Sequence, residues 1–222
     1  KGNVSCMINY AMMAKNGEGI PTNKSDGAKY YKMAADRGKV RQMYIYANMA
    51  KNGDGIPTNK NEAAKYYKMA ADQGDEDAMV AYAYMVDNGD GVSVNKSDAV
   101  KYYKMAADKG KEDAMWNYAI MMKNGDGVSV NKAEAAKYYK MAADKGNLKA
   151  ALNYSILVKN GDGVTANLSD AAKYCKMAAD GGIANACFNY AFMLHDGEGV
   201  TVNEAEAARY FKLSADKGHA RA

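Results

Sequence analysis

One stretch, Ala-Lys-Tyr-Tyr-Lys-Met-Ala-Ala-Asp at residues 28–36, returns along the chain with a period of 36 residues. Its paired aromatic position recurs six times without drifting by a single residue. The six pairs are Tyr30-Tyr31, Tyr66-Tyr67, Tyr102-Tyr103, Tyr138-Tyr139, Tyr174-Cys175 and Tyr210-Phe211. A strict period of this length indicates a solenoid, because each unit buries its apolar face only by stacking on its neighbours.

Each repeat contains two helical patterns separated by a glycine-containing loop. In the fourth repeat, apolar residues spaced for one helical face predict a first helix, here called helix A, over residues 112–124. Gly125 follows at the position of a left-handed C-terminal cap. Asn131 and Glu134 then mark the start of a second helix, helix B, because the Asn side chain caps free backbone N–H groups and the acid lies at the positive end of the helix dipole.

The same cap arrangement occurs in all six repeats, and the chain contains only 2 prolines. We therefore predict an all-α protein, a solenoid of six 36-residue helix-turn-helix repeats in a single array over residues 1–222. The predicted units are residues 1–36, 37–72, 73–108, 109–144, 145–180 and 181–216, with residues 217–222 starting a seventh helix.

The charge of the chain is nearly balanced, since 30 basic and 26 acidic residues give a formal net charge of +4. This small excess gives little support to nucleic acid as a partner. No apolar run approaches the roughly 20 residues of a membrane span, so we expect no membrane insertion. The chain starts at Lys1 rather than Met, so we expect a fragment or a processed product that can lack a targeting segment. The localisation stays open, and the cysteine spacing favours a reducing compartment such as the cytoplasm.

Three motifs recur in register and together carry a family resemblance. They are, in the fourth repeat, Ala114-x-x-x-Tyr118-Ala119, then Gly125-x-Gly127-Val128, then Glu134-Ala135-Ala136-Lys137-Tyr138-Tyr139-x-Met141-Ala142-Ala143-x-x-Gly146. This pattern resembles the Sel-1-like repeat family of the tetratricopeptide-like superfamily, over essentially the whole chain. The resemblance implies a right-handed superhelix with helix A on the concave wall, helix B on the convex wall, and partners held on the concave wall.

Helix A carries one face whose residues change from repeat to repeat, here called the variable stripe. Its four rows are Ser5, Arg41, Asp77, Asp113, Lys149 and Asn185; Ile8, Tyr44, Val80, Trp116, Leu152 and Phe188; Asn9, Ile45, Ala81, Asn117, Asn153 and Asn189; and Met12, Asn48, Tyr84, Ile120, Ile156 and Phe192. Large apolar side chains mixed with amides and charges, on a face that repeat packing leaves free, are typical of a protein-binding surface.

We therefore predict a non-catalytic protein-interaction scaffold or adaptor that binds a peptide or a partner helix on its concave face. The predicted contact residues are Tyr44, Asp77, Val80, Tyr84, Asp113, Trp116, Asn117, Ile120, Lys149, Leu152, Asn153, Ile156, Phe188, Asn189 and Phe192. Aromatic residues would anchor the partner and the amides would hold its backbone. An alternative is that the row from Ile8 to Phe188 packs on the preceding helix B. Another is end-to-end self-association, because neither terminal repeat has an obvious polar cap.

No arrangement of residues indicates catalysis, a metal site or a cofactor, and an enzyme or hydrolase-associated module stays a distant alternative. The Asn-Gly-Asp-Gly loops lack the ligand spacing of an EF-hand. His195 and His219 have no repeated Cys or carboxylate neighbours, and His195 takes a place that Lys123 and Lys159 fill elsewhere.

Two further residue sets have simple interpretations. We expect the three cysteines, Cys6, Cys175 and Cys187, to be small buried hydrophobes, because other repeats place Ala, Tyr or Met there. A column of cations on helix B, from Lys29 and Lys32 to Arg209 and Lys212, suggests a phosphate track as an alternative, but interleaved aspartates favour a solvated helix face.

Overall fold

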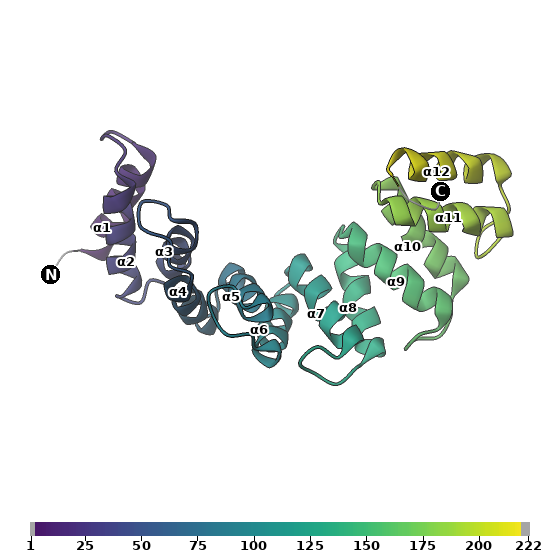
Figure 1. Cartoon of the computed structure of the whole chain (residues 1–222), viewed down its shortest axis with the longest axis horizontal. Helices are drawn as coiled ribbons and strands as arrows, with labels where there is room; N and C mark the ends of the chain where they lie inside the picture. The colour runs from purple at the N-terminus through teal and green to yellow at the C-terminus, as the bar shows by residue number, and fades with distance from the viewer. Residues whose placement is uncertain (1–2, 219–222) are drawn as a thin grey trace. The chain divides into compact units, whose positions relative to one another are not determined.

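The computed structural model describes residues 3–218, which form twelve α-helices and no strands (Figure 1). Odd-numbered helices are helix A of each repeat and even-numbered helices are helix B. The helices are α1 (Val4–Asn16), α2 (Lys24–Ala35), α3 (Val40–Asn52), α4 (Lys60–Asp72), α5 (Glu76–Asn88), α6 (Lys96–Asp108), α7 (Glu112–Asn124), α8 (Lys132–Asp144), α9 (Leu148–Asn160), α10 (Leu168–Asp180), α11 (Ala184–Asp196) and α12 (Glu204–Asp216). The predicted all-α solenoid fold of six two-helix repeats is thereby confirmed.

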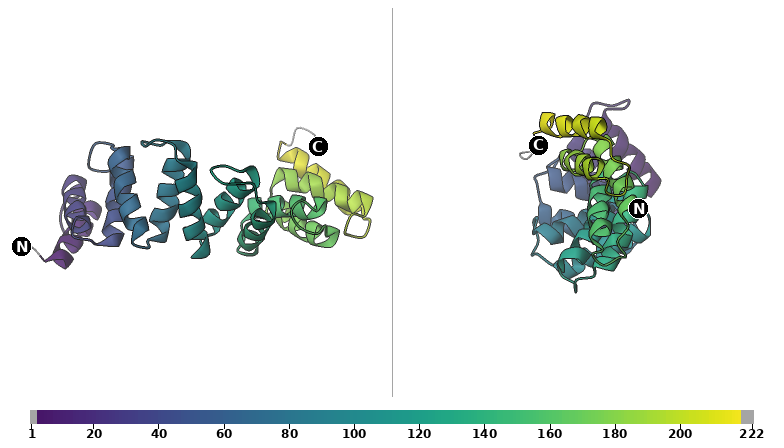
Figure 2. Two further views of the ribbon diagram at one scale, coloured as in Figure 1. Left: turned by 90° about the horizontal axis from the view of Figure 1, so that it is seen from below. Right: turned by 90° about the vertical axis from the view of Figure 1, so that its right-hand side faces the viewer.

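The chain divides into two compact units of three repeats each, unit 1 at Lys1–Lys109 and unit 2 at Gly110–Ala222. Within each unit, every helix A packs on the helix B that follows it, and that helix B packs on the next helix A (Figures 1 and 2). The grouping of all repeats into a single array stays a prediction. The predicted seventh helix falls mostly on residues 219–222, outside the described residues, as does His219.

Helix B begins at the predicted asparagine caps. In all six repeats the Asn side-chain oxygen accepts a hydrogen bond from the backbone N–H of the acidic residue three positions later, as Asn59 does from Glu62 at 3.0 Å. Each such cap contributes about 1 kcal/mol to stability. Helix A ends at the predicted left-handed glycine, for example Gly125 with a φ of 80°. These two signals fix where both helices of each repeat lie.

The first tyrosine of each aromatic pair joins helices within a repeat and between repeats. Tyr66 packs edge to face on Tyr46 of its own helix A, with ring centroids 4.8 Å apart. Its hydroxyl donates to Asp36 of the preceding helix B, and the Lys32 ammonium donates to that hydroxyl at 2.6 Å. Tyr174 repeats these contacts in unit 2, where the rings of Tyr174 and Tyr154 lie 4.8 Å apart. The most constant residues of the repeat therefore build the contacts between repeats.

The Gly-Asp-Gly loop after helix A is a second contact between repeats. Asp90 of the third repeat forms an ion pair with Lys60, the first residue of helix B in the preceding repeat, at 2.5 Å. Gly91 lies so close to Lys60 that a Cβ at this position would overlap the lysine Cβ. Its φ of 79° also lies in the left-handed region. The loop glycines and aspartate that resemble part of a calcium loop therefore act in packing.

In the cation column, one of the two cations of each helix B forms an ion pair with an acid. Lys68, Lys140 and Lys176 form ion pairs with the aspartate one turn later, at 2.7, 3.1 and 2.8 Å. Burial raises the pKa of Asp72, but hydrogen bonds from Lys68 and Tyr102 outweigh it and hold that pKa below its usual range. These pairs support the solvated-face interpretation over a phosphate track.

The three cysteines are free, and two of them are buried as predicted. The prediction is wrong for Cys6, which is exposed. The equivalent Ala78 and Ala150 are fully buried against a preceding helix B, and no helix precedes α1 among the described residues.

His195 contacts Glu204 at 2.9 Å. The equivalent positions of the third repeat hold Asp87 and Lys96, which form an ion pair. No helix within residues 3–218 combines the length and apolarity needed to cross a membrane.

Candidate protein-binding face

The variable stripe keeps large side chains in contact with solvent. The opposite side of helix A is fully packed, since Ala114 is 0% and Tyr118 is 3% exposed. On the stripe, Tyr84 is 50% exposed, and Ile156 and Phe192 are each 40% exposed. None of the predicted contact residues is buried; all of them are half-buried or exposed. The face that varies in sequence is thus the face of helix A that repeat packing leaves accessible.

In unit 1 the stripe combines tyrosines with a charged pair. The Arg41 guanidinium stacks 4.7 Å from the centre of the Tyr44 ring and forms an ion pair with Asp77 of the next repeat at 3.0 Å. The Lys51 ammonium lies 5.3 Å from the centre of the Tyr84 ring. Val80, which lies between Asp77 and Tyr84 in the sequence, is half-buried. Predicted residues Tyr44 and Asp77 are therefore connected through Arg41, which links α3 to α5.

In unit 2 the stripe is more apolar. Lys149 of α9 places its ammonium 5.3 Å from the centre of the Trp116 ring. The Trp116 indole Nε1 is buried and has no hydrogen-bond partner among the described residues. Asp113 is exposed, and Asn117, Ile120 and Leu152 are half-buried. A desolvated indole N–H without an acceptor is uncommon in folded proteins.

The row from Ile8 to Phe188 packs partly on helix B, but on helix B of its own repeat. Tyr44 contacts Tyr67 with centroids 5.7 Å apart, and Phe188 contacts Phe211 at 6.0 Å. Phe192 joins the latter cluster at 5.0 Å from Phe211. In these two repeats the second residue of the aromatic pair, Tyr67 or Phe211, therefore packs against side chains of the stripe.

Two of the three predicted asparagines of unit 2 differ in their surroundings. Burial raises the pKa of the Tyr139 hydroxyl to about 12, and the nearby side chain of Asn153 has the opposing effect. Asn189 holds the same position in the next repeat, where the tyrosine is replaced by Cys175. Asn153 therefore lies near a tyrosine hydroxyl of the chain, whereas the corresponding tyrosine beside Asn189 is missing.

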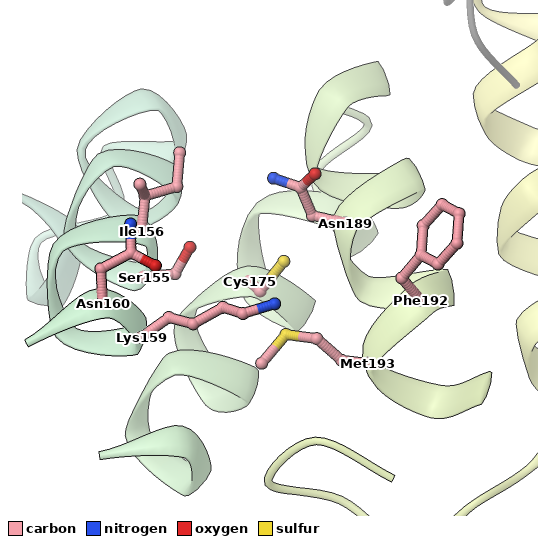
Figure 3. A pocket seen from close by; sticks show the side chains of 8 residues that line it. All are labelled: Ser155, Ile156, Lys159, Asn160, Cys175, Asn189, Phe192 and Met193. Carbon is pink, nitrogen blue, oxygen red and sulfur yellow. The ribbon is translucent and has the colours of Figure 1, made fainter. Parts of the chain in front are cut away.

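A pocket of about 260 Å³ lies at this position, between α9, α10 and α11 (Figure 3). Its lining residues are Ser155, Ile156, Lys159, Asn160, Cys175, Asn189, Phe192 and Met193. In Figure 3, α9 supplies one wall and α11 the opposite wall, with Cys175 between them and the Lys159 ammonium reaching across. Three predicted contact residues, Ile156, Asn189 and Phe192, are brought together here.

The other five lining residues were not predicted. The available signal was a pair of changes from the repeat pattern: Cys175 where Tyr67 and Tyr139 stand, and Ser155 where Ala119 and Ala191 stand. Both positions belong to the packed side of the repeat, so they were not considered as part of a site.

The chemistry of Cys175 argues against a nucleophile. Burial raises the pKa of its thiol to about 12, despite the opposing effects of Ser155 and Lys159. Its Sγ donates to the Ala186 carbonyl oxygen at 3.5 Å. A thiol of this kind is protonated near neutral pH and unreactive. The Lys159 ammonium is also occupied, since it pairs with Glu198 of the next loop.

Similar folds occur in solved bacterial proteins. A protective antigen present in uropathogenic Escherichia coli strains, which displays an SLR fold, superposes with a TM-score of 0.88 at 25% identity; the match covers 98% of this chain but only 46% of that protein. A Sel1 repeat protein from Oxalobacter formigenes superposes with a TM-score of 0.74 at 27% identity, over 97% of this chain and 88% of that one. No significant match was found among curated protein sequences.

The family assignment rests on the repeats themselves. The Sel1 repeat matches residues 4–39, 43–75, 76–111, 112–147, 148–183 and 184–219, which together span nearly the whole chain. Each match covers one helix A, one Gly-x-Gly loop and one helix B, except that the second match begins inside α3. This chain therefore belongs to the Sel1 repeat family.

Proposed function

We propose that this chain is a non-catalytic scaffold that binds a polypeptide segment along the variable stripe of helix A. Sel1 repeat proteins are generally protein–protein interaction scaffolds, and the family is generally non-catalytic. The observation that carries the proposal is the contrast on helix A: in α3, α5, α7, α9 and α11 its constant side is packed, whereas its variable side keeps Tyr84, Ile156 and Phe192 at 40% exposure or more.

The composition of the stripe suits a polypeptide better than a small polar ligand. Aromatic side chains anchored at their base, such as Tyr44 on Tyr67, offer large contact areas at low entropic cost. Amides such as Asn117 and Asn189 supply donors and acceptors for a peptide backbone.

The proposal is tested by selecting binders from a random peptide library on the intact chain and measuring their affinities. We expect Tyr84→Ala or Phe192→Ala to weaken selected peptides about tenfold or more, since an aromatic anchor contributes more than about 1 kcal/mol. Tyr84 is 50% exposed, so its removal leaves the core intact; Phe192 also packs on Phe188 and Phe211, so the folding of its variant is checked by circular dichroism. Fluorescence of Trp116, the only tryptophan, provides the titration signal.

Lys101→Ala and Lys173→Ala serve as matched controls, because both residues are exposed on helix B. These control variants are expected to bind as the parent does. Peptides that bind equally well to Tyr84→Ala and Phe192→Ala, or that are lost with the lysine variants, would contradict a binding face on helix A.

End-to-end self-association is a second candidate, favoured by the exposed apolar face of the first repeat. Tyr10 is 38% and Met13 is 36% exposed, whereas the equivalent Tyr46 and Met49 are 4% and 1% exposed beneath the preceding repeat. We expect the weight-average mass in sedimentation equilibrium to rise with concentration, and Met13→Lys to abolish that rise while Lys29→Ala does not. A constant monomer mass for the parent would exclude this candidate.

A further inference from the structure

Within each unit, the second residue of the aromatic pair lies between successive A helices. Tyr67 and Tyr139 are each only 1% exposed. The Tyr67 hydroxyl donates to Asn48 Oδ1 of its own helix A at 3.0 Å. The Asn153 side chain of the next helix A lies near the Tyr139 hydroxyl, since it opposes the rise in the pKa of that hydroxyl that burial causes. Tyr67 therefore reaches the fourth row of the stripe in its own repeat, and Tyr139 reaches the third row in the next repeat.

In the fifth repeat Cys175 takes the place of this tyrosine. The residues around it hold the same repeat positions as those around the tyrosines: Ile156 corresponds to Asn48, and Asn189 corresponds to Asn153. Both line the 260 Å³ pocket. The pocket is thus the space that a tyrosine ring fills in other repeats, left open because a small thiol replaces the ring.

We propose that this pocket binds the phenol ring of a tyrosine side chain supplied by the partner polypeptide. The inference rests on the proposed function, because the pocket opens on the variable stripe through Ile156, Asn189 and Phe192. An incoming ring would restore from outside the packing that Tyr139 provides from within the chain.

The lining groups match a phenol in size and chemistry. An apolar cavity of about 150 Å³ admits benzene, so the larger volume here has room for one substituted ring. Ile156, Phe192 and Met193 offer apolar and sulfur contacts to ring carbons. The aliphatic part of Lys159 adds further apolar contact, since its ammonium is paired with Glu198. The Asn189 amide is placed to supply the hydroxyl partner, as the Asn48 amide does for the Tyr67 hydroxyl at 3.0 Å.

The first test uses p-cresol, the side-chain analogue of tyrosine, and the capped peptide acetyl-Gly-Tyr-Gly-amide as probes. Both are titrated into the full chain labelled with ¹³C-methyl methionine, with the Met193 signal assigned through Met193→Leu. We expect saturable shifts of the Met193 methyl for both probes. Cys175→Tyr should abolish these shifts and raise the melting temperature, because the internal ring then occupies the pocket.

Two further variants separate a phenol site from a general apolar cavity. Asn189→Leu should weaken p-cresol about fivefold while leaving toluene unchanged, since it removes one hydrogen bond to the hydroxyl. Tyr139→Cys should create a second p-cresol site beside Asn153. Should Cys175→Tyr not fold, as judged by circular dichroism, Cys175→Leu fills the apolar part of the pocket and serves the same purpose.

The outcomes separate this inference from the binding face itself. Absence of p-cresol binding, or equal binding to the parent and to Cys175→Tyr, overturns the pocket assignment whatever the peptide library yields. Binding of p-cresol without the capped peptide overturns the assignment to a polypeptide side chain and identifies a free phenol as the ligand. Loss of selected peptides in Tyr84→Ala tests the stripe alone, because Tyr84 belongs to unit 1 and does not line the pocket.

Discussion

Replacing Tyr139 with alanine is expected to destabilise unit 2 by about 3 to 5 kcal/mol, the usual cost of truncating a buried aromatic residue. The Tyr139 ring is 1% exposed and lies on α8, which packs on α7 of its own repeat and on α9 of the next. Its loss removes packing from both repeats. In a repeat protein such a loss acts on the interface between neighbours as well as on the unit itself.

Urea unfolding followed by Trp116 fluorescence is the measurement for this prediction, because Trp116 lies on α7, which pairs with α8. Tyr139→Phe is the matched control, since it keeps the ring and removes only the hydroxyl, at a cost of about 1 kcal/mol. Phe211 shows that the sixth repeat accommodates a ring without a hydroxyl at this position. Equal destabilisation by the alanine and phenylalanine variants would mean that the ring itself contributes little.

Substituting alanine for Gly91 is expected to cost about 2 to 5 kcal/mol, through two separate effects. The left-handed backbone conformation disfavours any L-residue by about 1 to 2 kcal/mol. The added methyl would also overlap Lys60 of the preceding repeat. Overpacking of this kind costs a further free energy of about 1 to 3 kcal/mol. We expect amide hydrogen exchange to accelerate at the start of α4 and in the Gly89–Gly91 loop, where the two repeats meet.

Gly74→Ala provides the control for backbone conformation alone. Gly74 has a φ of 97°, and a Cβ there would meet no atom within 4 Å. Its substitution should show only the backbone cost, with exchange unchanged at the start of α4. An equal decrease in the free energy of unfolding for both variants would show that the overlap with Lys60 adds no cost beyond that of the backbone conformation.

Helix boundaries and caps were predictable because each signal is local and repeated. The prediction of helix A over residues 112–124 coincides with α7, and Asn131 caps α8 through Glu134 as expected. The left-handed Gly125 ends α7 for the same local reason. Such signals depend on the backbone within a few residues, so a single sequence contains them in full.

Contacts between repeats were not predictable in the same way. Asp90 and Lys60 are 30 residues apart, and each lies in a segment that looks like solvated loop or helix start. Only the stacking of α4 on α5 brings them together. The hydroxyl of Tyr66 reaches Asp36 across the same separation. Pairings of this kind follow from three-dimensional register, which sequence periodicity alone does not specify.

The pocket was missed for a different reason. Cys175 was correctly expected to be buried, but the consequence of its small volume lies in the side chains around it. Ile156, Asn189 and Phe192 were chosen for their variability, while Ser155 and Met193 belong to rows that looked purely structural. The pocket exists because Cys175 is smaller than the tyrosine found at this position in other repeats, and its lining is known only once the neighbouring helices are placed.

The loop contact also bears on how a chain of this kind changes length. Lys24 pairs with Asp54 at 2.8 Å, and Lys60 pairs with Asp90 at 2.5 Å, through the same two repeat positions. Excising residues 37–72 would bring Asp90 to Lys24 and Gly91 to the backbone that Gly55 now meets. Deletion or duplication of a whole 36-residue repeat therefore preserves the Lys–Asp ion pair and the close glycine contact between the repeats that become neighbours. A deletion of any other length brings together residues from non-equivalent repeat positions.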